Sequence, residues 1–311
     1  MKRVLLIGAG EVGLKHLSVL TATAGVEVVG VADPAPGQGV PGGLPLFESW
    51  RAALTVVSAD LVVVATPPGI ALVAARDAAA TGAAVIVEKP ATLTAADLEP
   101  RVGDERVFVA FQPHFAPGLD LLLAGPGRVV GAEVSLAVRR DHAYFRGWRR
   151  RFATAGGVLH QQAIHGLTLA LRLIPGGVES ADARVIHHRG FADTEDHVLA
   201  SIVLAGGRTV SVDACVDYPG SPFHEVVLQY DDGRRVRVRG RNLEAGVGAI
   251  SDAPTHQQLR RRLYTEVLAA AAGHPVHPCL FPLSALRRPL EVIDHVYRHA
   301  CVIRAASTAG A

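Results

Sequence analysis

Lysine is rare in this chain, and one lysine stands where acid–base chemistry is expected. Of the 31 basic residues, only three are lysines: Lys2, Lys15 and Lys89. Unlike an arginine, a lysine can release its proton near neutral pH when its surroundings demand it. Lys89 lies in the sequence Glu88-Lys89-Pro90, directly after the apolar run 85–87. Lys89 is therefore a candidate for proton transfer.

A glycine-rich hexapeptide near the N-terminus has the spacing of a dinucleotide-binding turn. It stands between the apolar run 3–8 and a helical pattern over 11–23. The first glycine makes a tight turn, the second lets backbone amides approach a pyrophosphate, and the third lets strand and helix pack closely. The amides and the helix N-terminus together form an anion site. The predicted cofactor-binding residues here are Gly8, Gly10, Glu11, Val12 and Gly13.

An acidic residue ends the next apolar run and predicts which dinucleotide binds. Asp33 follows the run 26–32, about 20 residues after Gly13, as expected for a ribose-binding acid. Its carboxylate can accept hydrogen bonds from the ribose hydroxyls and would repel a 2′-phosphate. The segment 34–45 contains no Arg or Lys to receive such a phosphate. The sequence therefore favours NAD over NADP, although Asp33 can also be read as a turn residue before proline.

The elements that must position these residues alternate between strand and helix. Strands are predicted over 3–8, 26–32, 61–65, 85–87 and 107–111, with helices over 11–23, 50–54 and 70–81. Continuous apolar strands that alternate with helices indicate a parallel sheet covered on both faces, as in a doubly wound Rossmann domain. Ligands of such sheets bind beyond the carboxyl ends of the strands, which is where Lys89 is expected.

The second half of the chain follows another pattern. Hairpins are predicted for 198–204 with 209–214 and for 226–230 with 236–239, and helices over 257–272 and 283–300. Hairpins imply an antiparallel sheet. We therefore expect an α/β Rossmann domain over residues 1–113 and an α+β domain with a largely antiparallel open sheet over 114–311.

Composition excludes several classes of protein. The 311 residues are 49% hydrophobic and 19% charged, which is typical of a soluble globular chain. A net charge of +2 gives no reason to expect a nucleic-acid partner. Three cysteines without CxxC spacing argue against disulfides and a zinc site, and no metal is expected. The apolar runs are too short to span a membrane, and a cytoplasmic location is the default.

Together these motifs closely resemble the glucose-fructose oxidoreductase / inositol dehydrogenase (Gfo/Idh/MocA) family. The resemblance spans nearly the whole chain and includes Thr66-Pro67-Pro68, Phe111-Gln112, Gly156-Gly157 through His165, and Thr194-Glu195-Asp196. It implies that Lys89 lies beside the nicotinamide and contacts the reacting hydroxyl, and that His165 completes the site. Thr66, Pro67 and Glu88 are expected to bind the cofactor. His16 matches a frequent histidine of the first helix and is given no catalytic role.

The chain departs from the family pattern around His165. Many relatives carry an aspartate four residues before this histidine, where this chain has Gln161, and another three residues after it, where it has Thr168. The stretch 159–165 is similar to a subgroup reading Leu-Met-Asn-Gln-Ala-Ile-His, whose members often act on nucleotide-linked sugars. Gln161 and His165 share one face of a helix, and without a neighbouring carboxylate His165 is expected to be neutral.

Substrate binding is expected at several further side chains. Tyr144, Trp148, Arg149 and Arg150 precede the glycine pair and have the chemistry to hold a diphosphate or a sugar, but they also fit a solvated basic surface. The full predicted substrate set is Lys89, Tyr144, Trp148, Arg149, Gln161, Gln162 and His165.

The leading hypothesis is an oxidoreductase that transfers hydride between a nicotinamide and a secondary alcohol or ketone of a sugar, cyclitol or nucleotide sugar. Lys89, His165 and Gln161 are its expected catalytic residues. Two alternatives stay open: a reductase of C=N bonds with the same architecture, and a non-catalytic NAD-binding sensor or scaffold. We also expect a homodimer or homotetramer formed through the C-terminal sheet.

Overall fold

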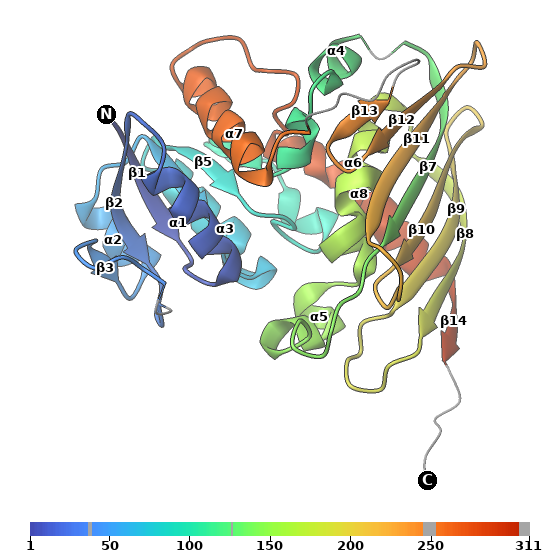
Figure 1. The fold of residues 1–311 in the computed structure, drawn as a ribbon, viewed down its shortest axis with the longest axis horizontal. Coiled ribbons are helices and arrows are strands. Elements are labelled where there is room, and N and C mark those ends of the chain that lie inside the picture. Colours follow the sequence, from blue (N-terminus) through green and yellow to red (C-terminus); the bar gives the residue numbers. More distant parts are fainter. Residues whose placement is uncertain (37–38, 126, 245–252, 305–311) are drawn as a thin grey trace. The chain divides into compact units, whose positions relative to one another are not determined.

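Two sheets organise the chain, each within its own compact unit (Figure 1). The computed structural model describes residues 1–36, 39–125, 127–244 and 253–304. The first unit comprises Met1–Thr92, Ala96–Phe115 and Pro254–Leu286, and the second comprises Leu93–Ala95, Ala116–Ala253 and Arg287–Ala311. We predicted one boundary at residue 113, with each domain formed by a single continuous segment. Each unit instead combines three separate segments of the chain.

The first unit contains a six-stranded parallel sheet in the order β3-β2-β1-β4-β5-β6. Its strands are β1 (Lys2–Ile7), β2 (Val26–Ala32), β3 (Leu46–Phe47), β4 (Leu61–Val64), β5 (Ala84–Val87) and β6 (Val107–Val109). The reversal of strand order next to β1 is that of a Rossmann fold. All four residues of β4 and of β5 are buried, as expected for strands covered on both faces. The predicted parallel sheet is confirmed.

The helices of this unit are α1 (Glu11–Thr21), α2 (Trp50–Val56), α3 (Pro68–Ala79) and α7 (His256–Ala271). The crossover from β5 to β6 contains only two 3₁₀ turns, Ala95–Leu98 and Asp104–Arg106. Helix α7 packs against α1, β5 and the turn Gln112–Phe115, and so covers the sheet there. The helix predicted over 257–272 is confirmed, but it groups with the first unit rather than with the residues that precede it.

The second unit contains an eight-stranded sheet in the order β13-β12-β11-β7-β10-β9-β8-β14. Its strands are β7 (Val129–Ala137), β8 (Val178–His187), β9 (His197–Leu204), β10 (Arg208–Cys215), β11 (Phe223–Tyr230), β12 (Arg235–Arg239), β13 (Asn242–Glu244) and β14 (Ala300–Arg304). Both predicted hairpins, β9–β10 and β11–β12, are confirmed. The central strand β7 and the strand β8 were not predicted, and β14 begins at residue 300, where the predicted helix was expected to end.

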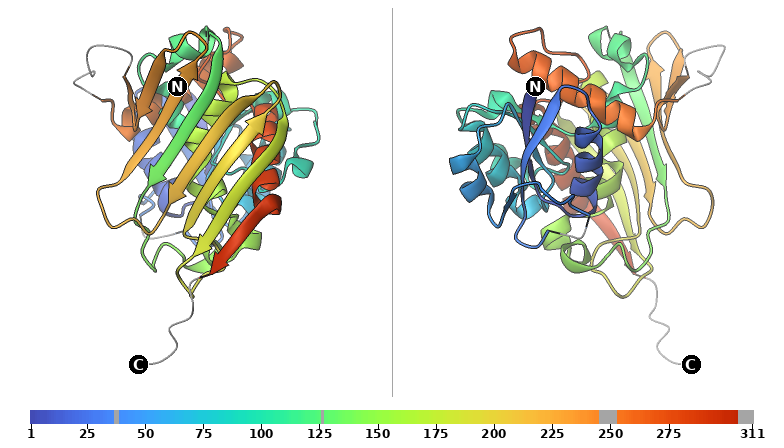
Figure 2. Two further views of the ribbon diagram at one scale, coloured as in Figure 1. Left: turned by 90° about the vertical axis from the view of Figure 1, so that its right-hand side faces the viewer. Right: turned by 60° about the vertical axis from the view of Figure 1, so that its left-hand side comes forward.

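Within the described residues, helices cover only one face of this sheet. Helix α6 (Ile164–Leu173) packs against β7 and β11, and α8 (Arg287–His299) packs against β8. Figure 2, left, shows the strands from the side that these two helices do not cover. Short helices α4 (Leu119–Ala124) and α5 (Phe152–Ala155) lie in the connections. No helix in the described ranges combines the length and apolar character needed to cross a membrane.

Candidate active site

Four neighbouring strands of the first unit deliver predicted site residues to one edge of the sheet. Asp33 follows β2, Gly8 follows β1, Thr66 follows β4 and Lys89 follows β5. Backbone hydrogen bonds continue beyond the strands: Gly8 N donates to Ala32 O at 2.8 Å, Ala65 N to Ile7 O at 2.7 Å, and Glu88 N to Val64 O at 2.8 Å. The carboxyl ends therefore stay aligned, and the sheet brings this predicted set together.

The three glycines of the turn have different reasons to be glycine. A Cβ on Gly8, whose φ is +93°, would lie 2.6 Å from the carbonyl oxygen of Ala65. A Cβ on Gly13 would lie 1.9 Å from the carbonyl oxygen of Gly8. A Cβ on Gly10 would meet nothing within 4 Å. Gly8 and Gly13 thus serve packing, whereas Gly10 leaves open space in front of the first-turn amides of α1, which a helix itself cannot pair.

Two buried polar atoms at this edge fit a bound dinucleotide. The hydroxyl oxygen of Thr66 and the side-chain oxygen of Gln112 are buried and have no hydrogen-bond partner within the part of the chain that the structure describes. Buried polar atoms without partners are costly, and a ligand that pairs with them offsets the cost. Gln112 follows β6, next to the strand that carries Lys89. Its position beyond a strand end is the signal that identifies it as a further candidate.

The two acidic residues predicted near the cofactor behave differently. Asp33 is half-buried, and its carboxylate accepts hydrogen bonds from Ala9 N at 2.7 Å and from Ala35 N at 2.8 Å. Glu11 is exposed and pairs with Lys15 at 2.6 Å. Asp33 thus lies against the glycine turn itself, while the Glu11 side chain has an exposed partner on the next turn of α1.

A buried hydrogen-bond network holds Glu88, the residue that precedes Lys89. One carboxylate oxygen of Glu88 lies 2.9 Å from His16 Nε2, and the other accepts a hydrogen bond from Lys89 N at 3.2 Å. His16 Nδ1 lies 2.6 Å from the hydroxyl of Tyr264 on α7. His16 is completely buried and Glu88 is 9% exposed, while Lys89 is half-buried. The sequence did not identify Tyr264, which lies 248 positions from His16.

The electrostatics of this network favour an ionised Glu88. Burial raises the pKa of the Glu88 carboxyl, but the hydrogen bond and charge of His16, with the charges of Lys89 and Arg260, outweigh burial and leave this pKa below its usual value. Burial raises the pKa of the Tyr264 hydroxyl far above its ordinary range, so Tyr264 keeps its proton. The Glu88 carboxylate therefore faces His16 and the backbone amide of Lys89. Its contact with the cofactor stays a prediction.

In the second unit, Tyr144 links the two glutamines that precede His165. Its hydroxyl donates to Gln161 Oε1 at 2.8 Å and accepts a hydrogen bond from Gln162 Nε2. Gln161 also donates to Gly156 O at 3.2 Å, and Arg140 donates to Gln162 Oε1 at 2.8 Å. Burial raises the pKa of Tyr144 despite the two nearby arginines, so the hydroxyl remains protonated.

Two guanidinium groups lie over the Tyr144 ring. The groups of Arg140 and Arg149 are each 4.9 Å from the ring centroid, and that of Arg149 is also 4.7 Å from the ring of Trp148. The structure thus brings together five predicted substrate residues and adds Arg140. Arg150 instead donates to the carbonyl oxygen of Phe191 at 2.9 Å.

His165 is half-buried at the start of α6, and a second histidine lies near it. The ring of His224, on β11, is 6.5 Å from that of His165. Thr168, which replaces the usual aspartate, is completely buried and donates to the backbone oxygens of Ile164 at 2.7 Å and His165 at 3.1 Å. The Thr168 hydroxyl is therefore hydrogen-bonded to the backbone of its own helix. His224 was missed because it comes from a strand 59 residues along the chain.

The glutamines lie on a π-helical turn, Leu159–Ala163, rather than on a regular α-helix. Glu195 accepts a hydrogen bond from Val158 N at 2.5 Å and another from the hydroxyl of Tyr297 on α8. That hydroxyl in turn accepts from Leu159 N at 3.1 Å. π-Helical turns are frequent at functional sites. Here the turn is hydrogen-bonded to the buried Glu195 and the half-buried Tyr297, which come from distant parts of the chain.

His160 lies within this π-helical turn and is held neutral. Its Nδ1 accepts from Gly157 N at 3.3 Å, so its Nε2 carries the hydrogen and donates to Leu93 O at 3.2 Å. The ring stacks on Tyr297 with 5.6 Å between centroids. Burial lowers the pKa of His160 to about 4.

Comparisons with known proteins agree with this architecture. A family model described as "Oxidoreductase family, NAD-binding Rossmann fold" matches residues 2–102, and the "GFO/IDH/MocA C-terminal domain" matches residues 126–243. A search of curated protein sequences found no match. The matched ranges together cover more than half of the chain.

Several solved structures share the fold. The WlbA dehydrogenase from Bordetella pertussis, in complex with NADH and UDP-GlcNAcA, is 24% identical with a TM-score of 0.77, over 96% of each chain. The UDP-N-acetylglucosamine 3-dehydrogenase GnnA from Acidithiobacillus ferrooxidans is 20% identical with a TM-score of 0.76, over 96% of this chain and 97% of that one. The 3-ketoreductase KijD10 from Actinomadura kijaniata, in complex with NADP and TDP-benzene, is 17% identical with a TM-score of 0.74, over 98% and 99%. The chain belongs to the Gfo/Idh/MocA family of oxidoreductases with an NAD-binding Rossmann fold.

Proposed function

We propose that this chain interconverts a secondary alcohol and a ketone on a sugar-like substrate, with Lys89 and His165 in proton transfer. The observation that carries the proposal is the position of Lys89 at the carboxyl end of β5, on the same sheet edge as the glycine turn after β1. Ligands of Rossmann sheets bind at this edge. A lysine in an arginine-rich chain is the cation suited to exchange a proton there.

We propose NAD rather than NADP as the cofactor. Gly8, Gly10 and Gly13 with the first amides of α1 would hold the pyrophosphate, and Thr66 Oγ1 offers a buried, unpaired polar atom to it among the described residues. Asp33 would accept from the ribose hydroxyls and repel a 2′-phosphate. When bound, NAD supplies the acceptor or donor of hydride for the substrate carbon.

The side chains of the chain itself would move and orient protons. In ketone reduction the ammonium of Lys89 donates a proton to the carbonyl oxygen, and in alcohol oxidation its amine takes the hydroxyl proton. His165 accepts a proton or a hydrogen bond from the substrate hydroxyl. Gln161 is oriented by Tyr144 and Gly156, which leaves its position well defined for a substrate hydroxyl.

Among sugar-like substrates, we propose one linked to a phosphate, such as a nucleotide sugar. Arg140 and Arg149 place two guanidinium groups beside Tyr144, and guanidinium binds phosphate through charge-assisted hydrogen bonds. Among the similar structures, WlbA was solved in complex with UDP-GlcNAcA and GnnA is a UDP-N-acetylglucosamine 3-dehydrogenase, which supports the same class.

A substrate panel with one lysine variant tests the proposal. Sugars, cyclitols, nucleotide sugars and imines are each incubated with NAD⁺ or NADH, and nicotinamide absorbance is followed. With the active substrate, Lys89→Met should lower kcat by about 10² to 10⁴-fold while NAD still binds. Lys2→Met, at the opposite end of the sheet, is the matched control. Unchanged turnover in Lys89→Met would exclude the role of Lys89, and activity on imines alone would favour C=N reduction.

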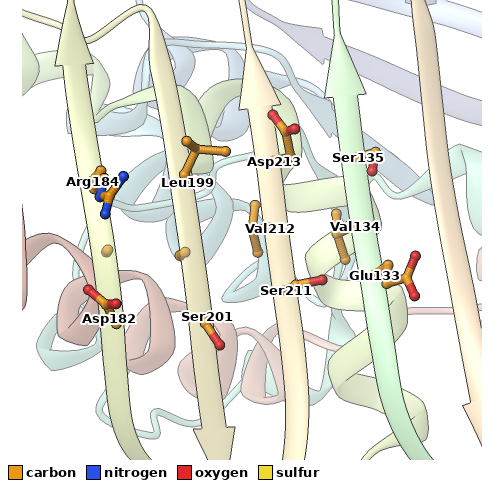
Figure 3. A pocket seen from close by; sticks show the side chains of 12 residues that line it. Glu133, Val134, Ser135, Asp182, Arg184, Leu199, Ser201, Ser211, Val212 and Asp213 are labelled. Atoms are coloured by element: carbon orange, nitrogen blue, oxygen red, sulfur yellow. The ribbon is translucent and has the colours of Figure 1, made fainter.

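We further propose a homodimer or homotetramer formed through the uncovered face of the second sheet. Two rows of side chains cross four strands there: Glu133, Ser211, Ser201 and Asp182 in one, and Ser135, Asp213, Leu199 and Arg184 in the other (Figure 3). Arginine and aspartate in one row suit pairing with an inverted second copy. Leu199→Arg should convert the oligomer to a monomer, measured by light scattering, and a monomeric wild-type protein would exclude the assembly.

The cytoplasmic location stays a prediction.

A further inference from the structure

We propose that Glu88 is the counter-charge of Lys89, and that His16 and Tyr264 hold Glu88 in place. Together the three residues would set the pH at which Lys89 gains and loses its proton. The role of Lys89 in proton transfer, proposed above, is the premise. Glu88, His16 and Tyr264 are then positioning residues that act through Lys89.

The network holds both ring nitrogens of His16. An ionised carboxylate can only accept, so His16 Nε2 carries the hydrogen that it donates to Glu88 over 2.9 Å. His16 Nδ1 pairs with the hydroxyl of Tyr264, 2.6 Å away. Both ring nitrogens of His16 therefore have a buried partner. Such a satisfied network fixes the orientation of the carboxylate.

The groups around Glu88 come from three segments of the first unit. His16 faces it from α1, Tyr264 and Arg260 from α7, and Lys89 from its own segment. Arg260 is itself 9% exposed. Because these surroundings are cationic or donate hydrogen bonds, the carboxylate stays charged although it is buried.

The charge on Glu88 acts on its neighbour. The second carboxylate oxygen accepts from the backbone amide of Lys89 at 3.2 Å, which places the charge at the base of that side chain. The charge of Lys89 lowers the pKa of Glu88, and by the same interaction the charge of Glu88 favours a protonated Lys89, whereas partial burial favours the neutral amine. Glu88 therefore opposes the effect of burial and keeps Lys89 as an ammonium to higher pH. Reduction needs this ammonium, and oxidation needs the amine.

The scarcity of lysine makes a direct test possible without any substrate. Protein labelled with [¹³Cε]lysine should give three signals, and Lys2→Arg and Lys15→Arg assign the two exposed ones. The Lys89 signal is titrated in wild type and in Glu88→Gln, which keeps the side-chain shape and an acceptor for His16. We expect the Lys89 midpoint to fall by about one pH unit or more in Glu88→Gln.

Two further variants sharpen the result. Tyr264→Phe keeps the ring but removes the hydroxyl that pairs with His16, and should lower the Lys89 midpoint by a smaller amount. Glu27→Gln removes an exposed carboxylate near the amino end of β2, where Glu27 lies beside Arg3 of β1, and should leave the midpoint unchanged. Circular dichroism confirms that each variant is folded. If Glu88→Gln does not fold, Tyr264→Phe alone decides, and no fall there overturns the proposal.

The outcomes separate this proposal from the proposed function. An unshifted Lys89 midpoint in folded Glu88→Gln overturns the counter-charge. A shifted midpoint with full turnover in Lys89→Met retains the counter-charge but removes the catalytic role of Lys89. If the counter-charge and the catalytic role of Lys89 are both correct, the pH profiles of reduction and oxidation should move to lower pH in Glu88→Gln. A merely structural role of Glu88 would lower both rates without moving either profile.

Discussion

The backbone amide of Ala9 donates a 2.7 Å hydrogen bond to the carboxylate of Asp33, so the acid that follows β2 ties down the glycine turn that follows β1. One residue thus has two separable roles. It stabilises the conformation of the turn, and its charge lies where a ribose is expected. Substitutions that keep the shape but remove the charge distinguish these roles.

Asp33→Asn should change cofactor preference. The amide keeps an oxygen for Ala9 but no longer repels a 2′-phosphate, so the ratio of the Kd for NADP to the Kd for NAD should fall about tenfold, which corresponds to about 1.4 kcal/mol. Fluorescence titration with NADH and NADPH measures both constants. Asp60→Asn is the matched control, because Asp60 accepts from Arg3 N at 2.7 Å at the start of β4. An equal ratio in wild type and Asp33→Asn would contradict the role of the charge.

Gly10→Ala and Gly13→Ala should fail in different ways. A methyl group on Gly10 meets nothing within 4 Å, so the fold should lose less than about 1 kcal/mol, whereas NAD affinity should fall at least about tenfold because the methyl occupies the pyrophosphate space. A methyl group on Gly13 would lie 1.9 Å from Gly8 O and should destabilise the fold by about 3 kcal/mol or more. Thermal unfolding and NADH titration separate the two. Tight NADH binding by Gly10→Ala would place the cofactor elsewhere.

Tyr144→Phe should impair catalysis without unfolding the protein. The ring keeps its contacts with Arg140 and Arg149, but Gln161 and Gln162 lose their shared hydroxyl. Loss of this orientation should lower kcat/KM about tenfold, or about 1.4 kcal/mol. Tyr218→Phe, whose ring packs against Phe223 in the same unit, is the control. If the two variants have the same kcat/KM, the hydroxyl of Tyr144 does not orient the site.

His160 should make the protein sensitive to mild acid. Its pKa is about 4 in the folded chain and near 6.5 when unfolded, so the unfolded state binds the proton first as the pH falls. The stability that neutral His160 contributes is complete above about pH 6.5 and is lost between there and about pH 4. Between pH 7 and pH 5 this residue alone should cost about 2 kcal/mol.

Urea unfolding at the two pH values measures this effect. The loss between pH 7 and pH 5 should be about 2 kcal/mol smaller in His160→Gln than in wild type, since all other groups are shared. His142→Gln, at an exposed position of the same unit, should match wild type. An identical loss in His160→Gln and wild type would show that this histidine is not buried in its neutral form.

The sequence by itself determined the Rossmann sheet and the edge at which the cofactor is expected. The runs 26–32 and 61–65 are strands because nearly every residue is apolar, and the glycine spacing sets the turn after β1. These signals are local, because backbone sterics and hydrophobic burial act over a few residues. Strand β8 escaped prediction because Ala, Ser, Glu and Asp blur its alternation, and β14 because it continues directly from α8.

Only the tertiary structure decided which side chains support the predicted site. His16 meets Tyr264 across 248 positions, and Glu195 meets Tyr297 across 102. Neither pairing has a local signature, because a hydrogen bond between distant residues depends on how helices pack on a sheet. The same holds for α7, which covers β5 where the β5–β6 crossover has no α-helix of its own. Local patterns thus named Glu88 and Lys89, and the packing of α1 and α7 supplied the side chains that hold Glu88.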